Sequence, residues 1–151
     1  MIKVTHGEKA AGYFQDGYNC SQSVVLAYCD DLKLDKELAL KLSSSFGGGM
    51  GRLREVCGAV TGMFMVAGLL HGYSNPTDKK AKDEHYRLIQ QLAEEFKNEH
   101  TTYICKDLLK VPGKEPPVSS ERTKEYYKTR PCVRFVITAC EILDKYFFDN
   151  N

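Results

Sequence analysis

The sequence has 151 residues, of which 42% are hydrophobic, and this length is typical of one globular domain. The 21 basic residues are balanced by 20 acidic residues, and this balance argues against a general nucleic-acid binder or a protein of anionic membranes. The first residues form no apolar signal segment, and the longest low-polarity run, 56–70, is short for a membrane span. We therefore expect a cytoplasmic protein with no nucleic-acid and no membrane partner.

Hydrophobic periodicity predicts helices along the whole chain and indicates no strand. The predicted helices cover residues 5–15, 20–32, 35–44, 56–73, 76–98, 103–109 and 132–148. Asn19 and Asp35 are suitable N-cap residues, and Pro131 is suited to the first turn of the last helix. The helix at 56–73 is apolar on nearly every side, which is typical of a buried central helix. These features predict an all-α fold, a single domain over residues 1–151 with about six or seven helices packed around 56–73.

Two segments interrupt this pattern. Residues 46–51 contain four glycines and predict a loop whose backbone approaches a neighbour closely. Residues 111–130 form a long, charged, proline-containing connection, in which 121–128 is able to supply a helical turn. Gly58 and Gly62 are spaced as G-x-x-x-G, which allows close contact with another helix of the chain, with a cofactor, or with a second copy in a homodimer.

The positions of the six cysteines suggest two groups. Cys29 and Cys140 lie on apolar helix faces, where cysteine is most often a small buried hydrophobe. The other four fall at predicted helix N-termini: Cys20, Cys57, Cys105 and Cys132. Free N–H groups and the helix dipole at such ends stabilise anions and lower the pKa of a thiol. Cations flank these positions as well: Arg52, Arg54, Lys106, Arg130 and Arg134.

If the four helix ends meet, the four thiols form a site for metal, cluster or thiol chemistry. The glycine loop would close over this site, with Gly48 and Gly49 offering N–H groups to sulfur. No C-x-x-C pair is present, so the common zinc-ribbon and thioredoxin spacings are absent. No C-x-x-C-H is present either, so we do not expect haem. Three alternatives stay open at this stage: an iron–sulfur cluster, a metal-free thiol–disulfide pair, and a structural four-cysteine zinc site.

The glycine loop and the histidines do not indicate a further binding site. The glycine loop matches neither the P-loop nor the dinucleotide-binding pattern, so a nucleotide site is not expected. The four histidines show no spacing that pairs one with a second metal ligand, and solvated or capping roles are expected for them.

Three segments resemble the C_GCAxxG_C_C family of redox-active proteins. They are Cys20-Ser21-Gln22-Ser23, the loop from Phe46 to Arg52, and the stretch from Glu55 to Gly62, while Cys105 and Cys132 match the two later cysteines of the pattern. In this chain glycine follows Cys57, as Gly58, whereas the family label places glycine before cysteine.

The resemblance implies redox activity without assigning a reaction or deciding whether the protein is an enzyme. The chain is also similar to the non-haem, iron–sulfur part of split-Soret cytochromes. This similarity implies an iron–sulfur centre ligated by Cys20, Cys57, Cys105 and Cys132, with Gly48, Gly49 and Gly58 close to it. It also implies an unidentified redox partner protein.

Overall fold

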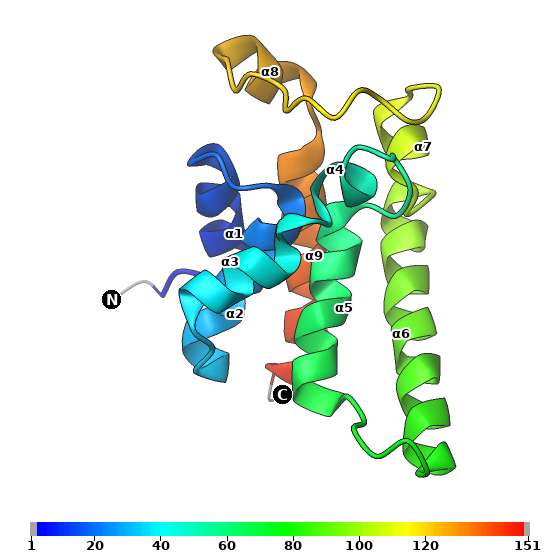
Figure 1. The fold of residues 1–151 in the computed structure, drawn as a ribbon. Helices are drawn as coiled ribbons and strands as arrows, with labels where there is room; N and C mark the ends of the chain where they lie inside the picture. Colours follow the sequence, from blue (N-terminus) through cyan, green and yellow to red (C-terminus); the bar gives the residue numbers. More distant parts are fainter. Residues whose placement is uncertain (1–2, 150–151) are drawn as a thin grey trace.

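The computed structural model describes residues 3–149, so residues 1–2 and 150–151 of the expected domain lie outside the described residues. Within this range the fold is all-helical apart from one isolated antiparallel bridge between Val56 and Ile104. The helices are α1 (His6–Gln15), α2 (Cys20–Leu32), α3 (Lys36–Ser44), α4 (Gly47–Met50), α5 (Gly58–His71), α6 (Lys79–His100), α7 (Cys105–Leu109), α8 (Lys124–Thr129) and α9 (Cys132–Phe147) (Figure 1).

Side-chain caps fix the starts of the early helices. Asn19 accepts a hydrogen bond from the Gln22 N–H, and the Gln22 side chain bonds back to the Asn19 N–H, forming a capping box at the start of α2. Asp35 caps α3 through the Leu38 N–H. Because these caps satisfy otherwise unpaired N–H groups, the starts of α2 and α3 follow directly from the sequence.

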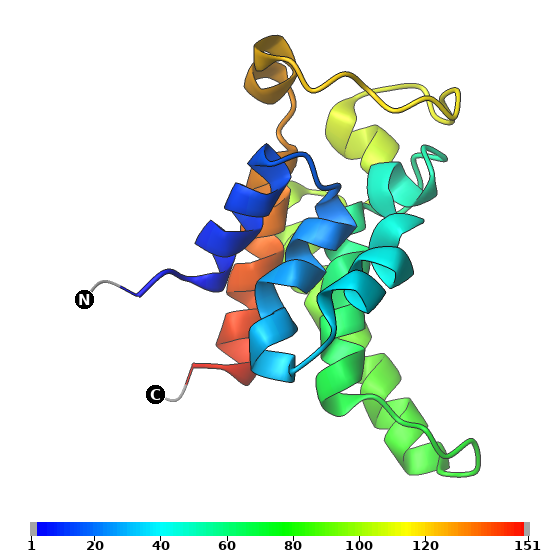
Figure 2. The ribbon, with the colours of Figure 1, turned by 60° about the vertical axis from the view of Figure 1, so that its left-hand side comes forward.

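The core forms where α5 packs against α2 and α9, with α1 and α6 on the outside (Figures 1 and 2). Met63, Val66 and Ala67 of α5 are fully buried. The predicted all-α single-domain bundle around a central apolar helix is therefore confirmed. The central helix is shorter than the predicted 56–73, because it begins at Gly58 and ends at His71.

Two short helical segments come in addition to those predicted. α8 lies inside the 111–130 connection, at the position where the sequence suggested a turn. α4 lies inside the glycine loop, where Gly48 and Gly49 have φ values of 68° and 66° and break the helical geometry. Only glycine adopts this left-handed backbone readily, so the segment is a tight, kinked turn more than a regular helix.

The G-x-x-x-G pair explains the close contact between α5 and α2. A Cβ atom on Gly62 would lie 2.9 Å from the Ser21 carbonyl oxygen, and one on Gly58 would lie 3.1 Å from the Ser21 N–H nitrogen. The first distance is shorter than real Cβ contacts and the second is tighter than most of them, so the two glycines are used for helix packing within the chain. The start of α5 is thereby brought against the start of α2.

The connection from 111 to 130, which we call the strap, crosses the end of the bundle where α5 and α9 begin (Figures 1 and 2). Arg52 holds the strap in place by two hydrogen bonds. Its Nε donates to the Pro116 carbonyl oxygen at 2.8 Å, and its Nη1 donates to the Ser120 hydroxyl at 3.0 Å. Across residues 3–149, no helix combines the length and the hydropathy that a membrane crossing requires.

Candidate functional site

A cavity of about 380 Å³ lies between the strap and the helix ends beneath it. All four cysteines predicted for the site line this cavity: Cys20, Cys57, Cys105 and Cys132. The three predicted glycines Gly48, Gly49 and Gly58 line it as well. The structure therefore brings together residues that are separated by up to more than a hundred positions in the sequence.

Cys20 and Cys57 meet because α2 and α5 touch at their first turns. Cys20 is the first residue of α2, and Cys57 is the N-cap residue of α5. A Cβ atom on Gly58 would lie only 3.2 Å from the Cβ of Cys20. The absence of a side chain at position 58 thus allows the two cysteines to share one wall of the cavity.

Cys57 and Cys105 are joined by a short antiparallel pairing of backbone segments. The Cys57 N–H donates to the Tyr103 carbonyl at 2.9 Å, and the Cys105 N–H donates to the Glu55 carbonyl. The bridge between Val56 and Ile104 lies between these two bonds. This pairing fixes Cys105, the first residue of α7, next to the start of α5.

The loop glycines make room for this arrangement. A Cβ atom on Gly49 would lie 2.6 Å from the Cβ of Cys105 and 2.8 Å from the Cα of Arg54. The carbonyl groups of Gly48 and Gly49 accept bonds from the N–H groups of Arg54 and Glu55. Donation from the N–H groups of Gly48 and Gly49 to sulfur stays a prediction. The helix α5 supplies N–H groups to sulfur, because Ala59 and Val60 bond the Cys57 thiol.

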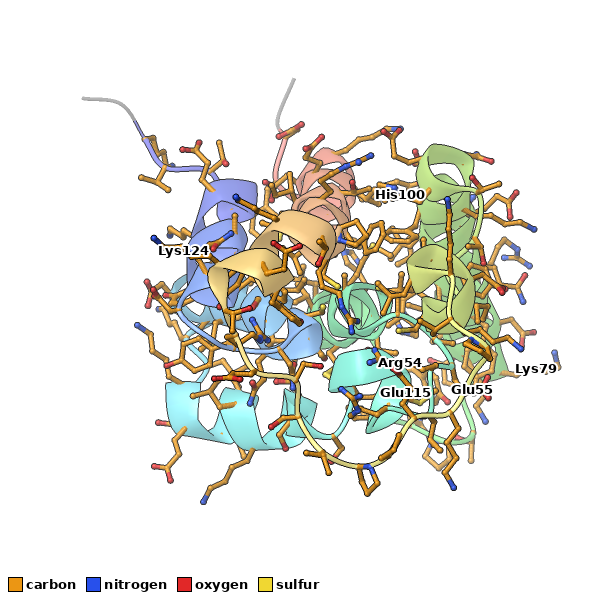
Figure 3. The ribbon with its side chains drawn as sticks, turned by 90° about the horizontal axis from the view of Figure 1, so that it is seen from above. Arg54, Glu55, Lys79, His100, Glu115 and Lys124 are labelled. Atoms are coloured by element: carbon orange, nitrogen blue, oxygen red, sulfur yellow. The ribbon has the colours of Figure 1, made fainter. Side chains whose placement is uncertain are left out.

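Arg54 is the most buried cation of the site, with 4% of its surface exposed. Its Nη1 lies 3.4 Å from the Cys105 sulfur, and its Nε donates to the Glu115 carboxylate at 2.6 Å. Figure 3 shows Arg54 next to the strap residue Glu115, away from the peripheral Lys79 and Lys124. The pKa of Glu115 is lowered, mainly by this bond to Arg54.

Burial changes the expected acidity of the thiols. It is the largest cause of the raised pKa of Cys57, about 12, and of the raised pKa of Cys105. The pKa of Cys20 is also raised, first by its hydrogen bond with Cys132 and then by burial. The expectation that helix ends and cations would lower the pKa is therefore wrong for these three thiols, because loss of water disfavours the thiolate more strongly than the nearby N–H groups and arginines favour it.

Cys132 is the exception among the four. Its hydrogen bond with Cys20 lowers its pKa, and Arg130, Arg54 and Arg122 lower it further against the effect of burial. Cys132 is therefore the thiol of this pair that loses its proton more readily. The first turns of α2 and α9 carry this pair.

The charged residues around the cavity are all cations. Four arginines line it: Arg52, Arg54, Arg122 and Arg130. Three of them were expected near the cysteines, but Arg122 was not, because nothing in the sequence places residue 122 of the strap beside Phe14 and Tyr18. Its guanidinium donates to the carbonyl groups of these two residues and lies 4.5 Å from the Phe14 ring. Lys106 and Arg134 do not line the cavity.

The remaining cysteines lie elsewhere. Cys29 is 1% exposed and its thiol contacts the Val25 carbonyl at 3.5 Å, while Cys140 is fully buried in α9. Neither lines the cavity, in agreement with the core position predicted for both. All six cysteines are free thiols in the structure.

One histidine has a role that the sequence did not suggest. His6 lies between two carboxylates, with Nε2 2.6 Å from Asp31 and Nδ1 2.7 Å from Asp144, and its ring stacks on Tyr28 at 4.0 Å. This group ties α1 to α2 and α9. It lies outside the residues that line the cavity.

The four thiols surround the cavity without converging on one point. In the part of the chain that the structure describes, no three His, Cys, Asp or Glu side chains are arranged to hold a single metal ion. All four thiols nevertheless line the same cavity.

A family model described as "Putative redox-active protein (C_GCAxxG_C_C)" matches residues 18–146 of the chain. The chain belongs to the C_GCAxxG_C_C family. No curated protein and no solved structure is similar enough to be matched. The region matched to the C_GCAxxG_C_C family contains all six cysteines and every helix that lines the cavity except α1. The chain is thus a cysteine-rich, all-α member of a family described by redox activity.

Proposed function

We propose that this protein is a redox protein whose cavity holds an iron–sulfur cluster, ligated by Cys20, Cys57, Cys105 and Cys132, for electron transfer or redox sensing. The observation that carries the proposal is the gathering of these four thiols, from four different helix ends, around one cavity. Four cysteine ligands are the usual set for such clusters. When bound, the cluster would supply one-electron chemistry.

The size of the site supports a polynuclear group over a single ion. Four thiolates around one zinc ion would lie about 3.8 Å from one another, because the Zn–S bond is about 2.3 Å long. The thiols of this protein are not arranged around one ion. A cavity of about 380 Å³ leaves space between them, and a core of several iron and sulfide atoms holds its ligands farther apart than one ion does. The zinc alternative is therefore disfavoured.

The surrounding residues suit thiolate ligands. The raised pKa of Cys57 and Cys105 means that these thiols carry their protons until a cation enters the cavity. Ligation then releases those protons, so uptake of the cofactor improves as the pH rises. Arg54 and the N–H groups of Ala59 and Val60 offset the negative charge that remains on sulfur.

The motif resemblance to the iron–sulfur part of split-Soret cytochromes, noted from the sequence, agrees with the same proposal. The sequence contains no C-x-x-C-H haem-attachment motif. The proposal therefore includes an iron–sulfur centre and a redox partner protein, with no haem.

Anaerobic purification from iron-replete cells tests the proposal, followed by absorption spectroscopy and by analysis of iron and acid-labile sulfide. We expect a brown protein whose iron and sulfide contents are similar and whose visible absorption decreases on reduction with dithionite. A colourless protein free of iron and sulfide from the same preparation would contradict the proposal. Zinc in place of iron would contradict it as well.

A second candidate function has a specific observation in its favour. The hydrogen-bonded pair Cys20 and Cys132 is suited to a reversible disulfide. The Cys132 thiolate would attack a disulfide oxidant such as oxidised glutathione, and Cys20 would then displace the glutathione thiolate to form one S–S bond. The two thiols lose two electrons and two protons in total. Peptide mapping after this oxidation is expected to show a Cys20–Cys132 bond, and equal alkylation of all six thiols would contradict it.

A further inference from the structure

The cavity is lined by more cations than the proposed cluster uses. Of the residues that line the cavity, four are arginines and none is acidic. Glu115 neutralises part of this charge through its bond to Arg54, but it does not itself line the cavity. Even if Cys132 is a thiolate, the lining keeps an excess of positive charge. A half-enclosed space of this kind attracts anions.

The arginines differ in how their donors are used. Arg52 and Arg122 bind strap and backbone oxygens, and Arg54 binds Glu115 and Cys105. Arg130 is partly buried and makes no side-chain hydrogen bond or ion pair within residues 3–149, and its guanidinium lies 5.4 Å from the Tyr126 ring and near the Cys132 thiol. Its donors are therefore available to a ligand in the cavity. A guanidinium binds a carboxylate through two parallel hydrogen bonds.

The remaining lining includes apolar and hydroxyl side chains. Leu108 and Leu109 are half-buried and supply aliphatic surface, the almost fully buried Phe14 and Phe135 add little, and Ser119 and Ser120 supply hydroxyl groups on the strap. A volume of about 380 Å³ is within the range of small-molecule sites, roughly 300–1,000 Å³. A wall with charged donors and a neighbouring apolar surface fits a ligand with one anionic end and one apolar body.

We infer that the cavity binds a small organic acid, with its carboxylate on Arg130 and its apolar part against Leu108 and Leu109. This inference depends on the proposed function in one respect only, namely that the bound acid would lie beside the redox group. Binding itself needs the arginines and the apolar wall. The strap carries Arg130 and the two serines, so it contributes both the cation and the hydroxyl groups of the site.

The test uses nitrogen-15-labelled protein, reduced and kept under argon, titrated with benzoate and followed by NMR. We expect saturable shifts of amide signals that belong to cavity residues such as Gly48 and Leu108. Benzamide, which has the ring without the charge, and acetate, which has the charge without the ring, are expected to bind about tenfold more weakly. Absence of saturable shifts at the cavity would overturn the inference, as would equal affinity for benzoate and either of these two compounds.

Variants separate the arginine from general charge effects. Arg130→Gln is expected to weaken benzoate binding about tenfold, and Arg130→Lys is expected to weaken it less because the charge is kept. Arg87→Gln, on the exposed surface of α6, is the matched control and should bind as the parent does. Unchanged binding by Arg130→Gln, with its circular dichroism as for the parent, would overturn the inference.

Iron and sulfide analysis of the same samples tests this inference and the proposed function separately. Benzoate binding by a protein that never takes up iron would support the organic-acid site and contradict the cluster. Iron and sulfide in a protein that does not bind benzoate would support the cluster and contradict the organic-acid site.

Discussion

The guanidinium of Arg54 lies between the Cys105 thiol and the Glu115 carboxylate, with Nη1 3.4 Å from the sulfur and Nε 2.6 Å from the carboxylate oxygen. This relationship connects three segments: the residues that follow the glycine loop, the start of α7 and the strap. Arg54 itself has a positive φ of 60°, which points to a backbone held in place by its surroundings.

We predict that Arg54 and Glu115 are energetically coupled. Arg54→Gln is expected to lower the free energy of unfolding by about 1–3 kcal/mol, because a buried charged hydrogen bond is lost. Glu115→Gln should also destabilise the protein, since it leaves the guanidinium without its carboxylate. Urea unfolding of both single variants and of the double variant measures the coupling. The double variant should be clearly less destabilised than the sum of the two single variants.

The pair Lys79 and Asp83 on α6 is the matched control for this cycle. These residues form an exposed i, i+4 ion pair, for which coupling is expected to be near zero. Strictly additive effects of Arg54→Gln and Glu115→Gln would show that the buried pair does not hold the strap.

Gly49→Ala is predicted to destabilise the protein by more than about 1 kcal/mol, because φ is 66° and the new Cβ would meet Cys105 and the Arg54 backbone. Gly12→Ala is the control, since its Cβ would enter open space in the regular helix α1. That change is expected to stabilise by about 0.5–1 kcal/mol. Thermal unfolding measures both variants, and equal shifts in the same direction would contradict this role of Gly49.

Stability is predicted to fall at mildly acidic pH because of His100. Burial between α6 and α9 lowers its pKa from 6.5, and its Nε2 lies 2.8 Å from the Thr138 hydroxyl. The unfolded chain therefore binds a proton more readily than the folded one as the pH falls below 6.5, and folding loses free energy until the folded-state pKa is passed. Urea unfolding between pH 7 and pH 5 should show this loss in the parent protein and a smaller loss in His100→Gln. An identical loss in both would contradict the assignment.

The sequence was sufficient to predict the helices because their signals are local. The caps Asn19 and Asp35 and the apolar pattern of α5 depend on residues within one or two turns. The position of the four cysteines at helix starts could be predicted from the sequence for the same reason. Their gathering around one cavity required the G-x-x-x-G contact between α5 and α2, which the sequence indicated but could not assign to a partner.

What the sequence did not predict depends on tertiary contacts. The raised pKa of Cys57 follows from complete burial, and the contact of Arg54 with Cys105 needs a left-handed backbone at a non-glycine residue. Arg122 and Glu115 belong to a strap without helical periodicity, so no local pattern indicated that they reach the cavity and its arginines. The contacts of His6 with two carboxylates join residues that are up to 138 positions apart in the sequence.

The separation of the cysteines into site and core gives a further prediction. Cys140→Ala and Cys29→Ala are expected to cost on the order of 1 kcal/mol each, because only a buried sulfur is removed. Chemical denaturation measures this cost. Neither variant should change the colour or the redox titration of the protein.

Iron and acid-labile sulfide per chain, measured in a matched series of anaerobically purified cysteine variants, test the central claim most directly. The account predicts that Ser at position 20, 57, 105 or 132 strongly lowers both contents or alters the spectrum of the cluster. It predicts parental contents and spectrum in Cys29→Ala and Cys140→Ala. Parental iron and sulfide after replacement of a cavity cysteine, or equal losses in all six variants, would contradict it.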